Sequence, residues 1–368
     1  MNDVNLVVGA GFSGAVIANL IASELDEKVL VIDKKNHIAG NCYDYRDENG
    51  IMIHKYGSHI FHTDSEKVWN YLKKFTDFNT YMHKVVGYLD GIETHIPFNF
   101  NTLYDVFPQT LAKKLEEKLL KYFEVNTKVP ILEFQKQDDE DLKFLANYVY
   151  EKIFLHYTTK QWGLSPKEVD GAVTARVPVY LSKDNRYFQD KYQGIPLEGY
   201  TKVIEKLLAH KNIKVKLNTD YKEVKNKEFK RIFYTGSIDE YYDYKFGQLP
   251  YRSVNFKFET YNKEYYQSNA CVNYPCNYDF TRIHEYKYYL DDKSNKTVIA
   301  KEYSENFELG KNERYYPIPN AENVELYNRY LEEAKKENVY FFGRLGDYKY
   351  YNMDKAIERA IELFEEIK

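Results

Sequence analysis

The chain has 368 residues and a formal net charge of −4, with 52 Lys and Arg against 56 Asp and Glu. This length excludes a single small domain and predicts two or three structural units. The chain has no basic block and no apolar run as long as a membrane span, so we expect neither nucleic-acid binding nor membrane insertion. The N-terminus shows no charged, apolar leader, so we expect a soluble cytoplasmic protein.

The first residues have the pattern of a dinucleotide-binding βαβ unit. An apolar strand, Val4 to Val8, leads through Gly9-Ala10-Gly11-Phe12-Ser13-Gly14 into a helix ending near Glu24, and Lys28 to Ile32 forms the next strand. The three glycines allow a tight turn, close approach of a pyrophosphate and close helix packing. Asp33 follows, where a carboxylate accepts hydrogen bonds from an adenosine ribose and disfavours a 2′-phosphate. The segment predicts an ADP-containing cofactor, either NAD or FAD.

Three histidines follow in a segment that we expect to be a strand turning back at Gly57, namely His54, His59 and His62 within residues 51–63. Histidines at short spacing raise the question of a metal site. We expect none, because nothing nearby supplies the carboxylate or thiolate of an organised ligand set.

The C-terminal residues favour FAD over NAD. We expect Val339 to Arg344 to form a buried strand, followed by a helix that Asn352 caps and that runs from Met353 to the end. A helix N-terminus directed at an isoalloxazine stabilises the negative charge of a reduced flavin. This late strand, glycine and capped helix predict a second contact with the cofactor.

The predicted fold class is α/β with three domains. The helical segment has leucines spaced by four residues, as at Leu111, Leu115 and Leu119, whereas the sheet segments alternate apolar and polar residues. We expect a discontinuous Rossmann-like FAD-binding domain (1–80, 195–245 and 335–368), a helical bundle domain (99–165) and a mainly antiparallel β-sheet substrate domain (81–98, 166–194 and 246–334).

Several short motifs, in order along nearly the whole chain, closely resemble those of the bacterial UDP-galactopyranose mutases. They are Gly57-Ser58-His59-Ile60-Phe61-His62-Thr63, Thr159-Lys160-Gln161-Trp162-Gly163, Arg176-Val177-Pro178-Val179, Tyr187-Phe188, Tyr192-Gln193-Gly194-Ile195-Pro196, Gly199-Tyr200-Thr201, Tyr251-Arg252-Ser253, Gly343-Arg344-Leu345 and Tyr348-Lys349-Tyr350-Tyr351.

The resemblance implies an isomerase, an intramolecular transferase, that interconverts UDP-galactopyranose and UDP-galactofuranose. In that family FAD is active in its reduced form: the flavin N5 attacks the anomeric carbon, UDP leaves, and the sugar ring opens and recloses. The resemblance also implies a cytoplasmic homodimer, an external reductant for the flavin, and a product that supplies galactofuranose for surface polysaccharide.

The resemblance assigns roles to residues of this chain. The catalytic residues are Arg176, Arg282, Arg344 and His59. The substrate-binding residues are Tyr157, Thr158, Trp162, Arg176, Tyr187, Arg282, Tyr316, Tyr350 and Asn352. The cofactor-binding residues are Gly9, Gly11, Phe12, Ser13, Gly14, Asp33, Lys34, Gly40, Asn41, His59, Ile60, His62, Arg252, Gly343, Arg344 and Met353. For Trp162, packing in the core is a competing explanation.

The chain departs from the family pattern at three positions. Ala39 replaces the first glycine of a Gly-Gly-Asn loop, Asp33 replaces a more usual Glu, and Asn352 occupies a position often held by Asp. Three alternatives stay open: a mutase acting also or mainly on UDP-N-acetylgalactosamine, an FAD oxidoreductase of the same fold, and a non-catalytic nucleotide-sugar binding protein. His59, where a longer cation would help to contact an acetamido group, favours galactose.

Overall fold

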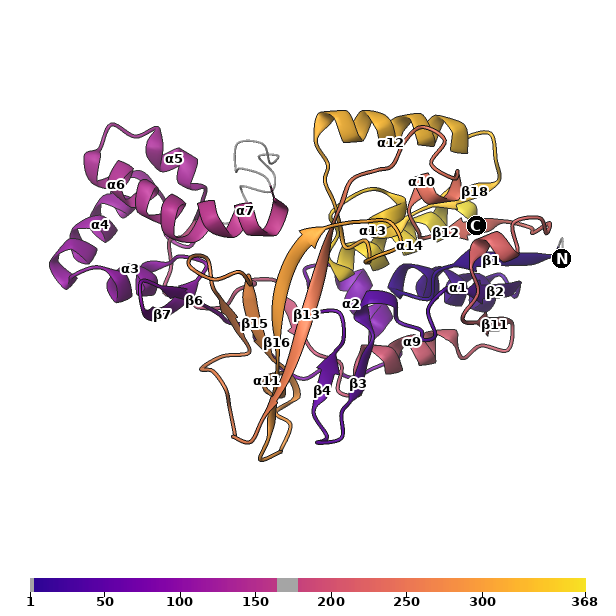
Figure 1. The fold of residues 1–368 in the computed structure, drawn as a ribbon, viewed down its shortest axis with the longest axis horizontal. Helices are drawn as coiled ribbons and strands as arrows, with labels where there is room; N and C mark the ends of the chain where they lie inside the picture. The colour runs from indigo at the N-terminus through magenta and orange to yellow at the C-terminus, as the bar shows by residue number, and fades with distance from the viewer. Residues whose placement is uncertain (1–2, 164–177) are drawn as a thin grey trace. The chain divides into compact units, whose positions relative to one another are not determined.

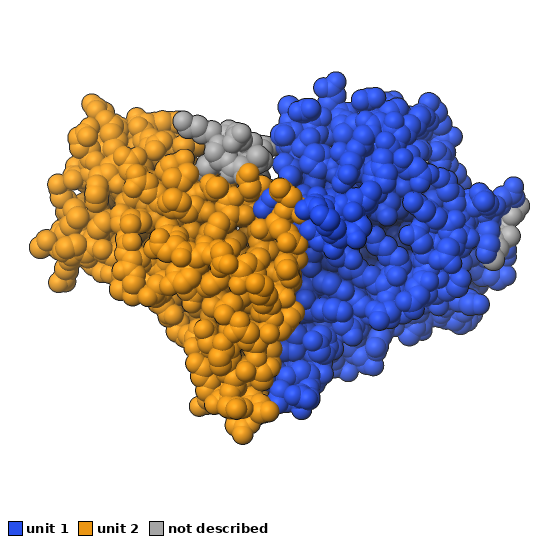
Figure 2. Space-filling model, viewed as in Figure 1, with its two compact units in different colours: residues 1–81, 190–253, 307–368 blue, residues 82–189, 254–306 orange. Residues whose placement is uncertain are grey.

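The computed structural model describes residues 3–163 and 178–368, which divide into two compact units (Figure 2). Unit 1 comprises Met1–Tyr81, Asp190–Ser253 and Phe307–Lys368, and unit 2 comprises Met82–Gln189 and Val254–Asn306. The segments predicted to bind FAD lie in unit 1. The predicted helical segment lies in unit 2, and the predicted sheet segments are shared between the units. The boundaries of three separate domains stay a prediction.

Unit 1 is built on a five-stranded parallel sheet with the strand order β11-β2-β1-β12-β18 (Figure 1). Its strands are β1 (Val4–Val8), β2 (Lys28–Ile32), β11 (Ile213–Lys216), β12 (Ile232–Tyr234) and β18 (Val339–Phe341). The fully buried Leu6 and Val7 lie on β1, at the centre. At the edge, β18 ends at Phe341, which is the only buried residue of this strand. The expected buried strand from Val339 to Arg344 was therefore too long, and its first two residues are less buried than expected. Parallel strands bring all five carboxyl ends to one edge of the sheet, where ligands bind in this class of fold.

The helices of unit 1 include a buried helix directly after the first strand. They are α1 (Phe12–Glu24), α2 (Glu66–Leu72), α9 (Tyr200–Leu208), α10 (Ile238–Tyr241), α12 (Ala321–Ala334), α13 (Gly343–Gly346) and α14 (Met353–Ile367), with 3-10 turns at Gly40–Cys42 and Tyr221–Glu223. Both α14 and α9 pack against α1, which is apolar on several sides. None of the helices in the described ranges has the length and apolar character of a membrane span.

The histidine segment of unit 1 contains two strands that pair with different partners. The first, β4 (Met52–His54), forms a hairpin with β3 (Asp44–Arg46), whereas β5 (Phe61–Thr63) pairs antiparallel with β10 (Tyr192–Gly194). Gly57 has the positive φ of +92° that a sharp turn requires. The predicted turn is therefore present, but the expectation of one strand folding back on itself was wrong.

Unit 2 contains a mostly antiparallel sheet with the order β13-β16-β15-β14-β6-β7. Its strands are β13 (Tyr251–Tyr261, which begins in unit 1 and pairs there with β17, Tyr316–Pro317), β16 (Thr297–Asn306), β15 (Arg282–Glu285), β14 (Cys271–Asn273), β6 (Val85–Leu89) and β7 (Ile92–Ile96). The pairs β15–β16, β14–β15 and β6–β7 are antiparallel, and β14–β6 is parallel. This confirms the predicted, mainly antiparallel sheet.

The helices of unit 2 are α3 (Phe100–Val106), α4 (Gln109–Tyr122), α5 (Ile131–Gln135), α6 (Glu140–Val149), α7 (His156–Trp162) and α11 (Lys287–Leu290), with a π-helical turn at Tyr150–Leu155 and short strands β8 (Lys128–Val129) and β9 (Val179–Tyr180). Helices α3 to α6 share one hydrophobic core with the sheet. Leu115 and Leu142 of the helices join Val85 of β6 and Cys271 of β14 in that core. The predicted helical bundle is thus packed onto the sheet.

Candidate functional site

The carboxyl edge of the parallel sheet in unit 1 is hollowed by a cleft of about 630 Å³. Most of the predicted cofactor residues line it, together with Asn352: Gly9, Gly11, Phe12, Ser13, Gly14, Asp33, Lys34, Gly40, Asn41, His59, Gly343, Arg344 and Met353. These residues come from the ends of strands and the first turns of helices far apart in the sequence. The position and lining of the cleft are those of a dinucleotide site.

The three glycines of the first turn have different structural reasons. At Gly9, with φ of +106°, a Cβ would lie 2.0 Å from Oγ1 of Thr235, and at Gly14 a Cβ would lie 1.9 Å from the carbonyl oxygen of Gly9. Both positions therefore need glycine for the fold itself. Gly11 has φ of −82°, and its Cβ would meet only the Cα of Gly40, at 3.9 Å. Packing does not require glycine there, so the missing side chain leaves room for a ligand at the helix end.

Two helix N-termini contribute positive potential to the cleft. Gly11 is the N-cap of α1 and has no side chain to bond the first N–H groups, and the first turn carries no acidic residue. Asn352, the N-cap of α14, makes no side-chain capping bond either and lines the same cleft. Unsatisfied N–H groups and the helix dipole together favour an anion such as a pyrophosphate.

Asp33 is held by the backbone of the turns around it. Its Oδ2 accepts a hydrogen bond from the N–H of Ala10 at 2.8 Å, and its Oδ1 accepts one from the N–H of Lys35 at 2.9 Å. The carboxylate therefore fixes the loop that follows β1. A carboxylate has further lone pairs, so the predicted contact with a ribose is compatible with these two bonds and stays a prediction.

The histidines of the 51–63 segment are held by polar contacts with the protein. His59 lines the cleft, and its Nδ1 is 2.7 Å from the carbonyl oxygen of Gly57, which assigns the Nδ1–H donor tautomer. The backbone N–H of His59 donates to Nδ1 of His54 at 3.1 Å. His62 is 3.2 Å from a carboxylate oxygen of Asp190. Neither Ile60 nor His62 lines the cleft, although both were predicted to contact the cofactor.

Arg344 brings two of the predicted substrate tyrosines together. Its Nε donates to the carbonyl oxygen of Tyr351 at 3.1 Å, and its guanidinium lies 5.3 Å from the ring centre of Tyr316 and 5.8 Å from that of Tyr350. The two rings stack at 5.1 Å. Neither tyrosine lines the cleft, but Arg344 does. The buried Arg252 is paired with Tyr316 across β13 and β17.

Unit 2 holds a second cluster around Arg282. Its Nε donates to Oε2 of Glu302 at 2.9 Å, and Nε2 of His284 lies at 2.9 Å from the same oxygen. Burial alone would raise the pKa of Glu302, but the Arg282 guanidinium and the bond from His284 outweigh it and lower the pKa to about 2. Burial raises the pKa of Tyr157, and the nearby Arg282 opposes that rise, so Tyr157 stays a neutral hydroxyl close to a cation. The sequence did not indicate Glu302.

Burial lowers the pKa of His284, so this residue stays neutral and donates its Nε2–H to Glu302. An unfolded histidine titrates near pH 6.5, so below that pH the unfolded chain binds a proton that folded His284 does not. The free energy of unfolding therefore decreases as the pH is lowered below about 6.5, by up to about 1.4 kcal/mol per pH unit. We expect His284→Gln, in urea unfolding between pH 6.5 and 5, to show a shallower fall than the wild type.

His156, which is exposed on α7, provides the control for this measurement. We expect His156→Gln to keep the slope of the wild type. A slope unchanged in His284→Gln would contradict the assignment of His284 as a buried neutral donor.

Helix α7 carries three more of the predicted substrate residues, and the structure separates them by burial. Thr158 and Trp162 are buried, which agrees with the core explanation for Trp162, whereas Tyr157 is only partly buried. Lys160 of the same helix donates to the carbonyl oxygens of Tyr278 at 3.2 Å and Phe280 at 3.1 Å. These bonds attach α7 to the loop between β14 and β15. Tyr187 packs at the edge of the unit 2 core.

Arg176 lies outside the described residues, and its role stays a prediction. Some of the cleft was not predicted at all. The loops at 219–221, 235–237 and 309–314 also line it. Residues 235–237 directly follow β12 and lie within the segment 195–245 that was expected in the FAD-binding domain, so their place near the cofactor was accessible from the sequence. The loop at 309–314 has no local pattern that indicates a ligand.

The parallel sheet, the glycine turn and the cleft define a protein with a Rossmann-like dinucleotide-binding domain. Comparison with known proteins agrees: the family model described as NAD(P)-binding Rossmann-like domain matches residues 7–75, and the model described as UDP-galactopyranose mutase matches residues 152–350. The chain belongs to the UDP-galactopyranose mutase family, and it is an isomerase.

Three relatives illustrate this membership. The chain is 38% identical to the "Probable UDP-galactopyranose mutase" of Klebsiella pneumoniae, covering 100% of this chain and 95% of the relative. It is also 38% identical to the dTDP-fucopyranose mutase of Escherichia coli, covering 98% and 97%. A crystal structure of a reduced UDP-galactopyranose mutase matches with a TM-score of 0.74 at 14% identity, covering 100% of this chain and 94% of that one, which supports the fold.

Proposed function

We propose that this protein is a UDP-galactopyranose mutase that interconverts UDP-galactopyranose and UDP-galactofuranose with reduced FAD. The observation that carries the proposal is the cleft of unit 1, where two helix N-termini and a glycine turn meet in a member of this family. The Arg282 cluster of unit 2 supplies a fixed cation of the kind that a diphosphate leaving group needs.

The cleft fits FAD by its own geometry. Gly11 leaves space where a pyrophosphate approaches the amides of α1, and Asp33 offers a carboxylate at the end of β2. Gly343, with φ of +82°, brings the backbone so close to Ser13 that a Cβ would lie 2.7 Å from its Oγ. When bound and reduced, the flavin supplies the nucleophilic N5 for the anomeric carbon, and its reducing equivalents come from an external donor.

Substrate binding and charge stabilisation are assigned to side chains of the protein. Arg282, Arg344 and Arg176 stabilise the charge of the departing diphosphate, and the side chains of Tyr157, Tyr316 and Tyr350 orient the nucleotide sugar. His59 presents its ring to the cleft in a tautomer fixed by Gly57. We further propose a cytoplasmic homodimer that supplies galactofuranose for surface polysaccharide.

A second candidate is a mutase for dTDP-fucopyranose, because the E. coli enzyme of that name has the same identity, 38%, as the Klebsiella relative. That substrate lacks the sugar 6-hydroxyl and carries a thymine methyl group. Asn352, which lines the cleft without a formal charge, is a departure that bears on substrate preference. We favour UDP-galactose because the matching family model describes that activity.

The proposal is tested with purified protein under strictly anaerobic conditions. We expect bound, non-covalent FAD and conversion of UDP-galactofuranose to UDP-galactopyranose after dithionite reduction, with little turnover by oxidised protein. Parallel reactions with UDP-N-acetylgalactosamine and dTDP-fucopyranose, followed by chromatography of the nucleotide sugars, rank the substrates. Equal turnover by oxidised and reduced protein would refute the reduced-flavin part, and a higher kcat/KM for dTDP-fucopyranose would favour the second candidate.

A further inference from the structure

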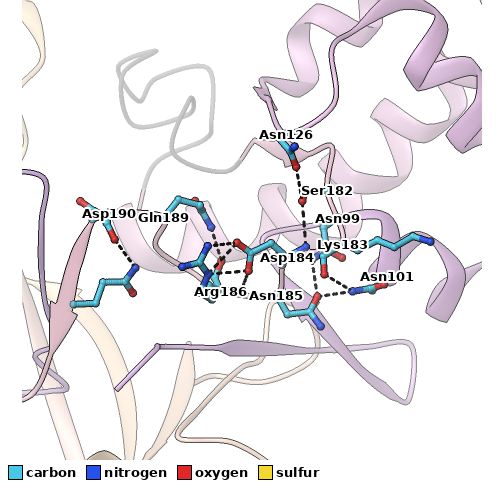
Figure 3. Close-up of polar contacts among 11 residues, drawn as sticks. Asn99, Asn101, Asn126, Ser182, Lys183, Asp184, Asn185, Arg186, Gln189 and Asp190 are labelled. Atoms are coloured by element: carbon cyan, nitrogen blue, oxygen red, sulfur yellow. Dashed lines mark hydrogen bonds and ion pairs between the residues drawn. The ribbon is translucent and has the colours of Figure 1, made fainter. Parts of the chain in front are cut away.

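A turn of unit 2, residues 182–187, ends at Tyr187 and is held in place by three asparagine side chains. Figure 3 shows these contacts. The Oδ1 atom of Asn185 accepts two hydrogen bonds, one from Nδ2 of Asn99 and one from Nδ2 of Asn101, both at 2.8 Å. We call Asn99, Asn101 and Asn185 the amide clasp. Both of these bonds use the oxygen of the Asn185 side chain, so the clasp depends on an acceptor at this position.

The two donors of the clasp are themselves fixed by helix α3. Asn99 is fully buried, and its Oδ1 caps α3 by accepting from the N–H of Thr102 at 3.0 Å. Its Nδ2 also donates to the carbonyl oxygen of Asp184 at 3.2 Å, and Nδ2 of Asn101 donates to the carbonyl oxygen of Lys183 at 3.0 Å. The start of a helix thus holds both the backbone and a side chain of the turn.

Further contacts fix both ends of the turn. At its start, Oγ of Ser182 donates to Oδ1 of Asn126 at 2.9 Å (Figure 3). In its middle, the Asp184 carboxylate accepts from Nη2 of Arg186 at 2.7 Å, and this bond lowers the pKa of Asp184. At its end, the N–H of Tyr187 donates to the carbonyl oxygen of His83 at 2.8 Å. The backbone at Tyr187 has little freedom left.

We propose that the amide clasp positions Tyr187 for binding of the nucleotide diphosphate, and this inference rests on the proposed function. Tyr187 lies close enough to Tyr157 to raise its pKa, and Arg282 of the cationic cluster acts on the same Tyr157 hydroxyl and lowers it. Its ring contacts Phe188 edge-on at 4.9 Å. A small shift of the turn therefore moves the Tyr187 hydroxyl, and we expect such a misplacement to weaken ligand binding.

The experiment is a double-mutant cycle between Asn185 and Tyr187, with UDP affinity measured by calorimetry on the FAD-loaded full chain. We expect Asn185→Ala to weaken UDP binding about five- to tenfold in the wild-type background and less than twofold in a Tyr187→Ala background. Asn185→Asp keeps the acceptor oxygens, so it is expected to stay within about twofold of the wild type. Thr297→Val removes a buried hydroxyl bond to Glu285 in the same unit and is the control for general loss of stability.

The outcomes separate this inference from the proposed function. Equal losses in both backgrounds, or an equal loss in Asn185→Asp or Thr297→Val, would overturn the positioning role while leaving the mutase proposal intact. If Asn185→Ala does not fold, the Asn101→Ala variant, which removes one of the two donors, takes its place in the cycle. A wild-type protein that binds FAD but neither UDP nor dTDP would overturn the proposed function and this inference with it.

Discussion

Gly11→Ala is expected to give a folded protein that has lost most of its FAD. The backbone at Gly11 has φ of −82°, which alanine adopts freely, and its Cβ would meet only Gly40 at 3.9 Å. The free energy of unfolding of the cofactor-free protein should therefore change by less than about 1 kcal/mol. A methyl group at the N-terminus of α1 instead blocks the close approach of the pyrophosphate, so we expect at least a tenfold loss of FAD affinity, measured by flavin fluorescence titration.

Gly14→Ala is the matched variant in the same turn. Its Cβ would lie 1.9 Å from the carbonyl oxygen of Gly9 and 3.1 Å from a methyl group of Val7, so α1 must move away from β1. Such overpacking costs about 1–3 kcal/mol or more, and we expect a lower melting temperature together with the loss of FAD. Normal FAD affinity in Gly11→Ala would contradict the pyrophosphate assignment, and an unchanged melting temperature in Gly14→Ala would contradict the packing argument.

The sequence predicted the parts of the fold that depend on local patterns. The strands at 4–8 and 28–32 and the helix between them are confirmed, because the glycine spacing and the apolar runs fix them locally. The pairing of β5 was not predictable in this way. Its partner is β10, whose residue Gln193 lies far along the chain from His62, and nothing in a single sequence indicates such a distant pairing.

In the candidate site too, residues of a local sequence motif were predicted, whereas a residue that acts through a neighbouring strand was not. Gly9, Gly11 and Asp33 belong to a motif whose spacing carries its chemistry, and all three line the cleft. Glu302 was missed because it acts through Arg282, which faces it from the neighbouring strand β15. One acidic residue among many, in an alternating strand, has no distinguishing pattern until the register of the two strands is known.

Arg282→Ala is expected to lower kcat/KM at least about tenfold, because a charge-assisted hydrogen bond contributes roughly 1.5–3 kcal/mol. Arg282→Lys keeps the charge but loses the planar fork, so it should recover only part of the activity. FAD content, measured by flavin absorbance, should stay at the wild-type level, because Arg282 is not among the residues that line the glycine cleft.

Lys301→Ala is the matched control for this loss of a cation. Lys301 lies on β16 next to Glu302 and pairs in register with Ile283, so its side chain points to the opposite face of the sheet, where its Nζ binds Glu259 at 2.7 Å. Removing this cation should change kcat/KM by less than about twofold, because Lys301 lies on the face opposite Glu302 and partly exposed ion pairs contribute little. Near-normal kcat/KM in Arg282→Ala would contradict the diphosphate assignment. An equal loss in Lys301→Ala would also contradict it, because the effect would then not be specific to the face of the sheet that carries Glu302.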